Sequence, residues 1–337
     1  MVEAYPWQAS LWQQWAGRAQ HAHAYLLHGP AGIGKRALAE RLMARLLCQQ
    51  PALDACGRCK ACLLLAAGTH PGRFLLQPDE PDKAIRVDQV RELVDFVSQT
   101  AQLGGHKVVL IEPAEAMNVN ASNALLKSLE EPAGSTVLLL VSHQPSRLLP
   151  TLKSRCVQQA CPLPSKAHSE QWLASALPEV AADERAELLV LAAGSPLVAL
   201  RLYGEGVREQ RTRVVEGVKK LLKQQQGPSQ LADSWSDVPL LLLFDWFCEW
   251  AQAILRYQLT EDESGLGLND MRKVLQYLAQ KSPQPRVLHA QDWILQQRQK
   301  VLAKANLNRP LLLEALLVHW AGLPGPARPP SSSKEAS

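Results

Sequence analysis

The sequence has little excess charge and no apolar run long enough for a membrane. Its longest apolar stretch toward the C-terminus, Val238–Phe244, is far shorter than the roughly 20 residues that a membrane-spanning helix needs. The N-terminus, Met1–Trp7, does not have the charged and then apolar pattern of a secretory leader. Lys and Arg number 36 against 32 Asp and Glu, and a net charge of +4 is too weak to indicate a dedicated nucleic-acid binder. We therefore expect a cytoplasmic protein without a membrane partner.

Internal repeats are also absent, and 337 residues suffice for two or three domains. In the first half of the chain, apolar strand patterns alternate with helical ones, which predicts an α/β fold with a parallel sheet flanked by helices. The expected strands are Tyr25–His28, Phe74–Leu76, Lys107–Glu112, Thr136–Ser142 and Val157–Pro162. We expect Asp88 to cap one helix and Pro132 to end another.

The second half lacks a convincing strand. After Pro164 the apolar periodicity is helical, with turn-rich breaks at Gly227–Ser229 and Glu261–Gly267. The end of the chain, from Gly322, is rich in Pro and Ser and cannot bury apolar surface, which predicts disorder.

Disulfides are not expected in a reducing compartment, so the seven cysteines need another explanation. Four of them follow the spacing C-x7-C-x2-C-x2-C. These four are Cys48, Cys56, Cys59 and Cys62. Four thiolates complete a tetrahedral zinc shell and leave no open position, so the spacing favours structural zinc over four free thiols. No His or carboxylate pattern accompanies the cluster, which argues against a catalytic metal. We interpret Cys156, Cys161 and Cys248 as packing residues.

The first expected strand leads into a glycine-rich loop with the pattern G-x4-G-K. Its glycines and lysine are Gly29, Gly32, Gly34 and Lys35. Between a strand and a helix, such a loop directs backbone N–H groups and a lysine toward phosphates. The hydroxyl that normally follows the lysine and holds magnesium is missing, because Arg36 stands there.

The acidic residues of a hydrolytic site are degraded too. An ATPase of this type needs an acid for magnesium at the end of a neighbouring strand and a glutamate that activates water. Here Glu112 follows the strand Val108–Ile111, and Pro113 stands where acid–base chemistry would be needed. We expect no hydrolysis, and the sequence leaves open whether nucleotide binds without turnover or not at all.

Arg155 lies in the segment Ser154–Cys156, just before the last expected strand. An arginine presented to the nucleotide of a neighbouring subunit stabilises the charge on the transferred phosphate. The alternative is an ordinary surface salt bridge.

Several segments occur in the order seen in bacterial clamp-loader subunits, and the chain resembles this family of AAA+ proteins from the DNA polymerase III holoenzyme. The segments are Gly29–Lys35, the four cysteines, Gly68–Pro71, Leu103–Val109, Asn123–Pro132, Ser154–Cys156 and, more thinly, Gly194–Pro196 and Asn308–Leu312. Within the family, the degenerate site is typical of the member that does not hydrolyse ATP, rather than of the hydrolysing γ/τ subunit.

The resemblance implies an AAA+ P-loop core over residues 1–163 with a five-stranded parallel sheet and a zinc module at 48–62. It further implies a small helical lid over 164–206, and a helical collar that oligomerises over 207–323, followed by the tail 324–337. The family's zinc ligands correspond to the four clustered cysteines. The lid arginine of ATP-binding members falls near Leu197 and is absent.

The implied role is that of a stator in a hetero-oligomeric ring with γ/τ and δ. Arg155, flanked by Ser154 and Cys156, reaches the ATP of a neighbouring γ/τ subunit, and the complex loads the sliding clamp onto primed DNA. The chain is then no enzyme alone but a subunit of a DNA-directed DNA polymerase holoenzyme. Two alternatives are a γ/τ-type ATPase motor, against which Arg36 and Pro113 speak, and a zinc-dependent nucleic-acid-binding module that uses Arg147, Lys153 and Arg155.

Overall fold

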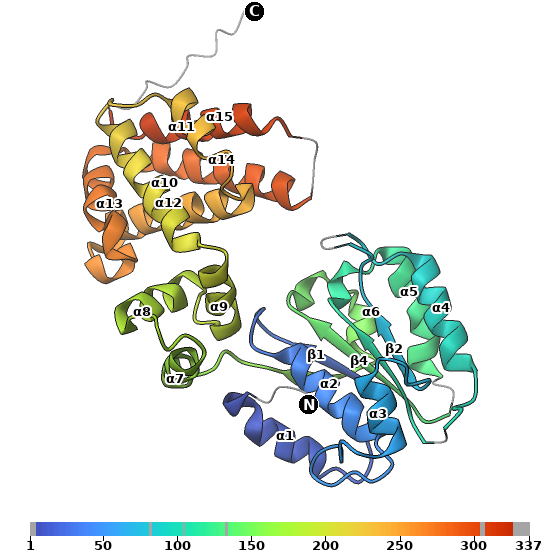
Figure 1. The fold of residues 1–337 in the computed structure, drawn as a ribbon. Coiled ribbons are helices and arrows are strands. Elements are labelled where there is room, and N and C mark those ends of the chain that lie inside the picture. The colour runs from blue at the N-terminus through green and yellow to red at the C-terminus, as the bar shows by residue number, and fades with distance from the viewer. Residues whose placement is uncertain (1–4, 81–82, 104, 132–133, 304–306, 326–337) are drawn as a thin grey trace, which may run out of the picture. The chain divides into compact units, whose positions relative to one another are not determined.

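The structure, a computed structural model, describes residues 5–80, 83–103, 105–131, 134–303 and 307–325 (Figure 1). The chain forms two compact units, Met1–Leu202 and Tyr203–Ser337. The first is α/β and the second is helical in its described residues. In the part of the chain that the structure describes, no single helix is long and apolar enough to cross a membrane. Only the bent pair Ala182–Leu191 and Pro196–Gly204 passes on length and composition.

The first unit is built on the predicted five-stranded parallel sheet, and its strands lie in the order β2-β3-β4-β1-β5. The strands are β1 Ala24–His28, β2 Arg73–Leu76, β3 Lys107–Ile111, β4 Thr136–Ser142 and β5 Val157–Ala160. Strand β1 lies between β4 and β5, pairing with β4 through Leu26 and Leu140 and with β5 through Leu26 and Gln158. The continuous apolar runs of β3 and β4 are buried because helices cover both faces of a parallel sheet.

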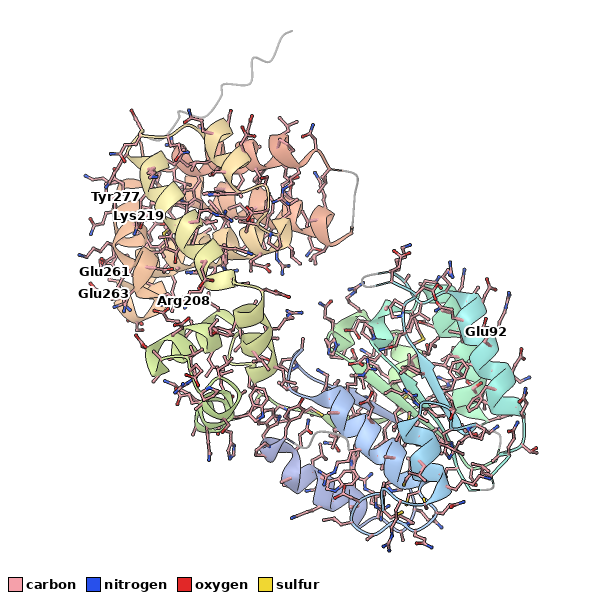
Figure 2. All side chains as sticks on the ribbon, in the orientation of Figure 1. Glu92, Arg208, Lys219, Glu261, Glu263 and Tyr277 are labelled. Atoms are coloured by element: carbon pink, nitrogen blue, oxygen red, sulfur yellow. The ribbon has the colours of Figure 1, made fainter. Side chains whose placement is uncertain are left out.

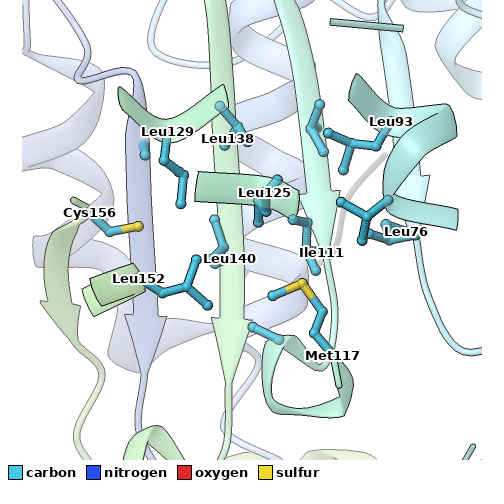
Figure 3. Close-up of a cluster of buried hydrophobic side chains, with 14 of the residues drawn as sticks. Leu76, Leu93, Ile111, Met117, Leu125, Leu129, Leu138, Leu140, Leu152 and Cys156 are labelled. Carbon is cyan, nitrogen blue, oxygen red and sulfur yellow. The ribbon is translucent and has the colours of Figure 1, made fainter. Parts of the chain in front are cut away.

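Alternate residues of each strand enter two separate cores. Val109 and Ile111 of β3 face one core together with α4, α5 and α6 (Figure 3). Val108 and Leu110 face the other core, which contains α1 and α2. The helices of this α/β layer are α1 Ala9–Ala16, α2 Lys35–Leu47, α3 Lys60–Ala66, α4 Val87–Ser98, α5 Val119–Glu130 and α6 Pro150–Lys153. Short 3-10 turns span Pro6–Gln8, Ala114–Ala116 and Pro145–Arg147. Exposed charged side chains such as Glu92 project from the helices into solvent (Figure 2).

Three further helices complete the first unit after β5. They are α7 Lys166–Ala176, α8 Ala182–Leu191 and α9 Pro196–Gly204. Gly194, at φ +82°, lies between α8 and α9 and allows the sharp bend of 107° between them. The separation of these helices from the α/β layer as a lid domain stays a prediction.

The second unit packs its helices around an aromatic centre. Its helices are α10 Val207–Leu222, α11 Pro228–Ser234, α12 Leu240–Thr260, α13 Asn269–Lys281, α14 Gln284–Leu302 and α15 Arg309–Ala321, with a 3-10 turn at Glu263–Leu266. Phe247 of α12 meets Trp320 of α15 edge to face at 4.8 Å and Trp250 at 5.0 Å. Arg211 is buried against Trp246 and Trp250 and forms an ion pair with Asp270.

Local details differ from the sequence-based expectations. Arg86 is the N-cap of α4, so the prediction that Asp88 caps it was wrong. Asp88 instead lies in the first turn and pairs with Arg91. Helix α3 begins after its N-cap Cys59 and contains Cys62, and α11 follows the break at Gly227; neither helix was predicted. Pro132 and the tail from residue 326 lie outside the described residues.

Candidate functional site

The glycine-rich segment Gly29–Lys35, called the phosphate loop below, connects β1 to α2. Gly29, Gly32 and Gly34 all have positive φ, and Gly34 is the left-handed N-cap of α2. A β-carbon on Gly29 would lie 2.0 Å from the carbonyl oxygen of Cys161, so only glycine fits there. The loop therefore has the strand–loop–helix position that phosphate binding requires.

Lys35 is turned inward instead of toward an open phosphate site. The residue is 2% exposed, and its Nζ donates to the carbonyl oxygen of Gly29 at 2.7 Å and to that of Pro30. Burial lowers the pKa of Lys35 to about 8, although Cys161 and two nearby glutamates act in the opposite direction. The lysine thus neutralises carbonyl dipoles of its own loop.

The remaining loop carbonyls are taken by segments far away in the sequence. Ser195 Oγ donates to Ala31 O at 2.7 Å, and the backbone N–H of Leu197 donates to Gly32 O at 3.1 Å. Before β1, Trp7 Nε1 donates to Ile33 O and Gln8 Nε2 donates to Ile33 O and Gly34 O. Every carbonyl from Gly29 to Gly34 therefore accepts a hydrogen bond from the chain itself.

The two residues that depart from the magnesium-binding pattern lie together. Arg36 Nη1 is 3.2 Å from Glu112 Oε2, and Arg36 Nε donates to Glu40 Oε1 at 2.9 Å. Glu112 follows β3, is only 12% exposed at its side chain, and precedes Pro113 through a cis peptide bond. Burial raises the pKa of the Glu112 carboxyl, while the neighbouring Arg36 lowers it. The Arg36 guanidinium therefore faces the carboxylate that follows β3.

Glu115 accepts hydrogen bonds from the backbone after β4. Its Oε1 accepts the backbone N–H groups of His143 at 2.8 Å and Gln144 at 3.1 Å, so it caps the turn that follows β4. His143 Nε2 lies 3.9 Å from Glu112. Burial lowers the pKa of His143, as does the charge of Lys35, so the ring is held neutral. Neither Glu112 nor Glu115 is arranged as a base that activates water.

Arg155 lies on the surface at the end of α6 and before β5. Its Nε donates to Glu130 Oε1 at 2.7 Å, and its Nη1 donates to Thr151 O at 2.9 Å. The side chain keeps one-third of its surface exposed. Ser154 Oγ accepts a longer hydrogen bond from Nη1, whereas Cys156 points into the core. The guanidinium is oriented but accessible.

The four clustered cysteines come together around one centre. Their Sγ atoms all lie within 4.8 Å of one another, with Cys48 and Cys59 3.9 Å apart and Cys56 and Cys62 4.0 Å apart. A tetrahedral zinc ion with Zn–S bonds of about 2.3 Å needs sulfur atoms roughly 3.8 Å apart, so the set fits this metal. The backbone N–H of Cys62 donates to Cys59 Sγ and lowers the pKa of that thiol to about 6, which favours the thiolate.

The cysteine module, residues 48–62, is fastened to α2. Arg41 donates to both carboxylate oxygens of Asp54, at 2.6 and 2.8 Å, and stacks over the ring of Trp12 at 4.1 Å. The other cysteines, Cys156, Cys161 and Cys248, are buried, and burial raises the pKa of each. That agrees with their interpretation as packing residues.

The sequence had not indicated several residues of the site. Ser195 belongs to the segment Gly194–Pro196 that carried part of the family resemblance, but nothing in its spacing showed that it contacts the phosphate loop. Glu130 similarly belongs to Asn123–Pro132 and pairs with Arg155. Nothing in the sequence indicated that Trp7 and Gln8 donate to carbonyl groups of the phosphate loop.

Comparisons with known proteins agree with this geometry. Residues 6–162 match the family described as "DNA polymerase III, delta subunit", and residues 206–322 match "DNA polymerase III, delta subunit, C terminal". The chain is 73% identical to DNA polymerase III subunit delta′ of Pseudomonas aeruginosa, over 97% of this chain and 100% of that protein. It is 34% identical to the subunit of the same name from Yersinia pestis, over 94% of this chain and 95% of that protein.

Among solved structures, the fold is similar to a DNA polymerase III gamma subunit-related protein of Thermotoga maritima. The TM-score is 0.47 at 19% identity, covering 94% of this chain and 98% of that one. The family assignment depends on the sequence identity to the delta′ subunits over nearly the full length. The chain belongs to the DNA polymerase III delta′ subunit family.

Proposed function

We propose that this chain is a non-hydrolysing clamp-loader subunit that works in the cytoplasm as a stator. It sits in a hetero-oligomeric ring with γ/τ and δ subunits, and the ring loads the sliding clamp onto primed DNA. The resemblance to delta′ subunits supports the assembly and the substrate. The Arg36–Glu112 ion pair is the observation that carries the absence of hydrolysis, because it occupies the position of the magnesium ion.

Arg155 supplies the subunit's contribution to chemistry. It completes the ATP site of a neighbouring γ/τ subunit and stabilises negative charge on the transferred phosphate. The pair with Glu130 holds the guanidinium extended before assembly, and one-third exposure leaves it accessible to a neighbour. A phosphate is a stronger partner than a solvated carboxylate, so Arg155 exchanges Glu130 for ATP on assembly.

The other parts have supporting roles. Cys48, Cys56, Cys59 and Cys62 hold a structural zinc ion that has no open coordination position. Residues 164–206 form the lid and residues 207–323 the collar that joins the ring. Because Ser195 and Leu197 bind the phosphate loop, the lid is locked onto the core and does not respond to nucleotide.

The first test is the ATPase activity of the isolated chain. We expect no turnover above background. The control is Lys35→Ala, which removes the phosphate-loop charge and should leave that background unchanged. Robust hydrolysis that disappears in Lys35→Ala would identify the chain as a γ/τ-type motor and defeat the proposal.

The second test compares reconstituted complexes with γ/τ and δ. Arg155→Ala should leave assembly intact but lower the ATPase activity that DNA and clamp stimulate by about tenfold or more. The matched control is Arg147→Ala, another surface arginine, whose Nη1 donates only to Gln144 within the described residues. Equal activities of the two variants would remove Arg155 from the neighbouring ATP site.

A further inference from the structure

A cavity of about 500 Å³ lies beside the cysteine module and includes no residue of the phosphate loop. Its walls come from the segment after α1, the C-terminal end of α2, the start of α3 and the loops that precede β2 and β3. The cysteine module also contributes Cys48, Gln49 and Pro51 to the lining. The lining contains two arginines and three histidines but no carboxylate. These are Arg18, His21, Arg45, His70 and His106. We call this cavity the basic pocket.

His70 presents a hydrogen-bond donor that nothing satisfies. The residue is 6% exposed, and its Nδ1 accepts the backbone N–H of Gly72 at 3.0 Å. A neutral imidazole with an accepting Nδ1 carries its hydrogen on Nε2. Nε2 is buried and has no partner among the described residues. Burial also lowers the pKa of His70, which keeps the ring neutral. A buried donor without a partner destabilises the folded chain, so the position favours an acceptor.

Contacts with Tyr25 give His21 the same tautomer as His70. The hydroxyl of Tyr25 accepts hydrogen bonds from Arg18 Nη1 and from the backbone N–H of Ala22, both at 3.0 Å. Its own hydrogen is then directed to His21 Nδ1, 3.3 Å away. The neutral ring consequently carries its hydrogen on Nε2, which is buried and unpartnered among the described residues. His21 and His70 of the basic pocket thus both carry their hydrogen on Nε2, and neither Nε2 has an acceptor among the described residues.

Positive charge surrounds these donors. Arg45 is held by hydrogen bonds from Nη2 to Ala16 O at 2.7 Å and from Nε to Ala52 O at 3.2 Å. Within the described residues, neither Arg45 nor Arg18 forms an ion pair with a carboxylate. Burial lowers the pKa of His21, and the charges of Arg45, Arg18 and His106 lower it further.

Arginine and Nε2-protonated imidazole donate hydrogen bonds and accept none at these atoms. A ligand that suits such a lining brings several acceptor atoms and negative charge, and a phosphate group does both. Cavities of about 300–1,000 Å³ are typical of small-molecule sites, so there is room for more than one phosphate. We propose that the basic pocket is a binding site for a phosphate-bearing ligand, held by Arg18, Arg45, His21 and His70.

Calorimetric titration of the zinc-loaded full chain with pyrophosphate tests this site. We expect saturable binding that is unchanged in Lys35→Ala, because the phosphate loop takes no part. Replacing both pocket arginines, Arg18→Gln with Arg45→Gln, should weaken binding by about tenfold or more. The control is Arg91→Gln, which removes a single positive charge from exposed α4 and should change affinity less than about twofold.

A second pair of variants protects the test against misfolding. Leu103 lines the basic pocket and is 37% exposed, so Leu103→Glu adds a repelling carboxylate without deleting a hydrogen bond. Val119→Glu adds the same charge at an exposed position on α5 and serves as its control. We expect only Leu103→Glu to weaken pyrophosphate binding. Equal effects of the two substitutions, or binding lost in Lys35→Ala, would overturn the proposal, as would no binding up to about 10 mM pyrophosphate.

Competition then separates the sources of phosphate. A 5′-phosphorylated oligonucleotide and its unphosphorylated counterpart are added to the pyrophosphate complex. Displacement by the phosphorylated strand alone assigns the basic pocket to a nucleic-acid end, and displacement by neither assigns it to a small phosphorylated molecule. Displacement by both strands equally, with affinity that survives in the arginine double variant, would contradict the assignment.

Discussion

At the N-terminal end of α2 the carbonyl groups of the phosphate loop accept hydrogen bonds from the chain itself, whereas at the C-terminal end two buried imidazole donors have no acceptor among the described residues. Lys35 and Ser195 supply donors to the loop carbonyls, and Arg36 pairs with Glu112. After Leu47, four sulfur atoms lie within 4.8 Å of one another. In the adjoining basic pocket, two imidazole donors have no acceptor among the residues that the structure describes.

This comparison shows that a recognisable sequence motif does not by itself indicate that a ligand binds. Buried polar groups are almost always paired, so a set that is already paired has little to gain from a ligand. The phosphate loop has the more recognisable sequence, but its carbonyl groups and Lys35 are already paired with each other or with the rest of the chain. We expect ligand binding at the cysteine module and the basic pocket to stabilise the C-terminal end of α2 most.

The largest expected effect is loss of the metal at the C-terminal end. Cys59→Ser combined with Cys62→Ser should reduce bound zinc from about one ion per chain to less than about a tenth, since two ligands cannot complete the shell. The free energy of unfolding of the first unit should fall by about 4 kcal/mol or more, because metal binding and folding of the module are coupled. Metal analysis and chemical denaturation measure the two changes.

Cys248→Ser is the matched control for this pair. Cys248 is buried in α12, in the second unit, so the same chemical change should leave the zinc content untouched. Stoichiometric zinc in the cysteine double variant, or the same zinc loss in Cys248→Ser, would contradict the assignment of the ligands.

A smaller effect tests whether the phosphate loop is filled by its own chain. A β-carbon on Gly32 would lie 2.5 Å from Val198 Cγ2 and 2.6 Å from Ser195 Oγ, at φ +70°. Gly32→Ala should therefore lower the free energy of unfolding by about 2–4 kcal/mol, from backbone strain and steric overlap together.

Gly57→Ala separates those two contributions at the opposite end of α2. Gly57 has φ +72°, but a β-carbon there meets nothing within 4 Å. It should cost only the strain of a left-handed residue, about 1–2 kcal/mol. Equal losses in the two variants, measured by urea denaturation of zinc-loaded protein, would mean that α9 does not pack on the loop in solution.

The sequence predicted the features that are encoded locally. The apolar runs of β3 and β4 identify buried strands, because both faces of a parallel sheet are covered. The cysteine spacing and the glycines of the phosphate loop identify their sites in the same way. Helix α11 was missed because Gly227 and Pro228, taken as a break, are the N-cap and first residue of a helix.

What the sequence did not reveal depends on contacts between distant segments. Ser195 reaches Ala31 across 164 residues, and no spacing rule connects them. Arg36 and Glu112 were each recognised as departures from an ATPase site, but their pairing arises only when β3 lies beside the start of α2. The basic pocket likewise requires His70 and Arg45 to meet through the folded sheet.

The most gradual expected effect is a difference in pH dependence at the N-terminal end. Burial lowers the pKa of Lys35 from 10.5 to about 8, so between these values the unfolded chain binds more protons than the folded one. Stability therefore rises with pH across this window, relative to Lys35→Met, by less than about 1.4 kcal/mol per pH unit. Below pH 8 both states are protonated and the difference is constant. Lys127→Met, at an exposed position on α5, should show no such trend against wild type. Urea denaturation at pH values of about 7, 8, 9 and 10 measures how the stability difference between wild type and Lys35→Met changes with pH. Parallel curves for wild type and Lys35→Met would show that the lysine moves freely into solvent, and that the phosphate loop is as open to a ligand as the opposite end of the helix.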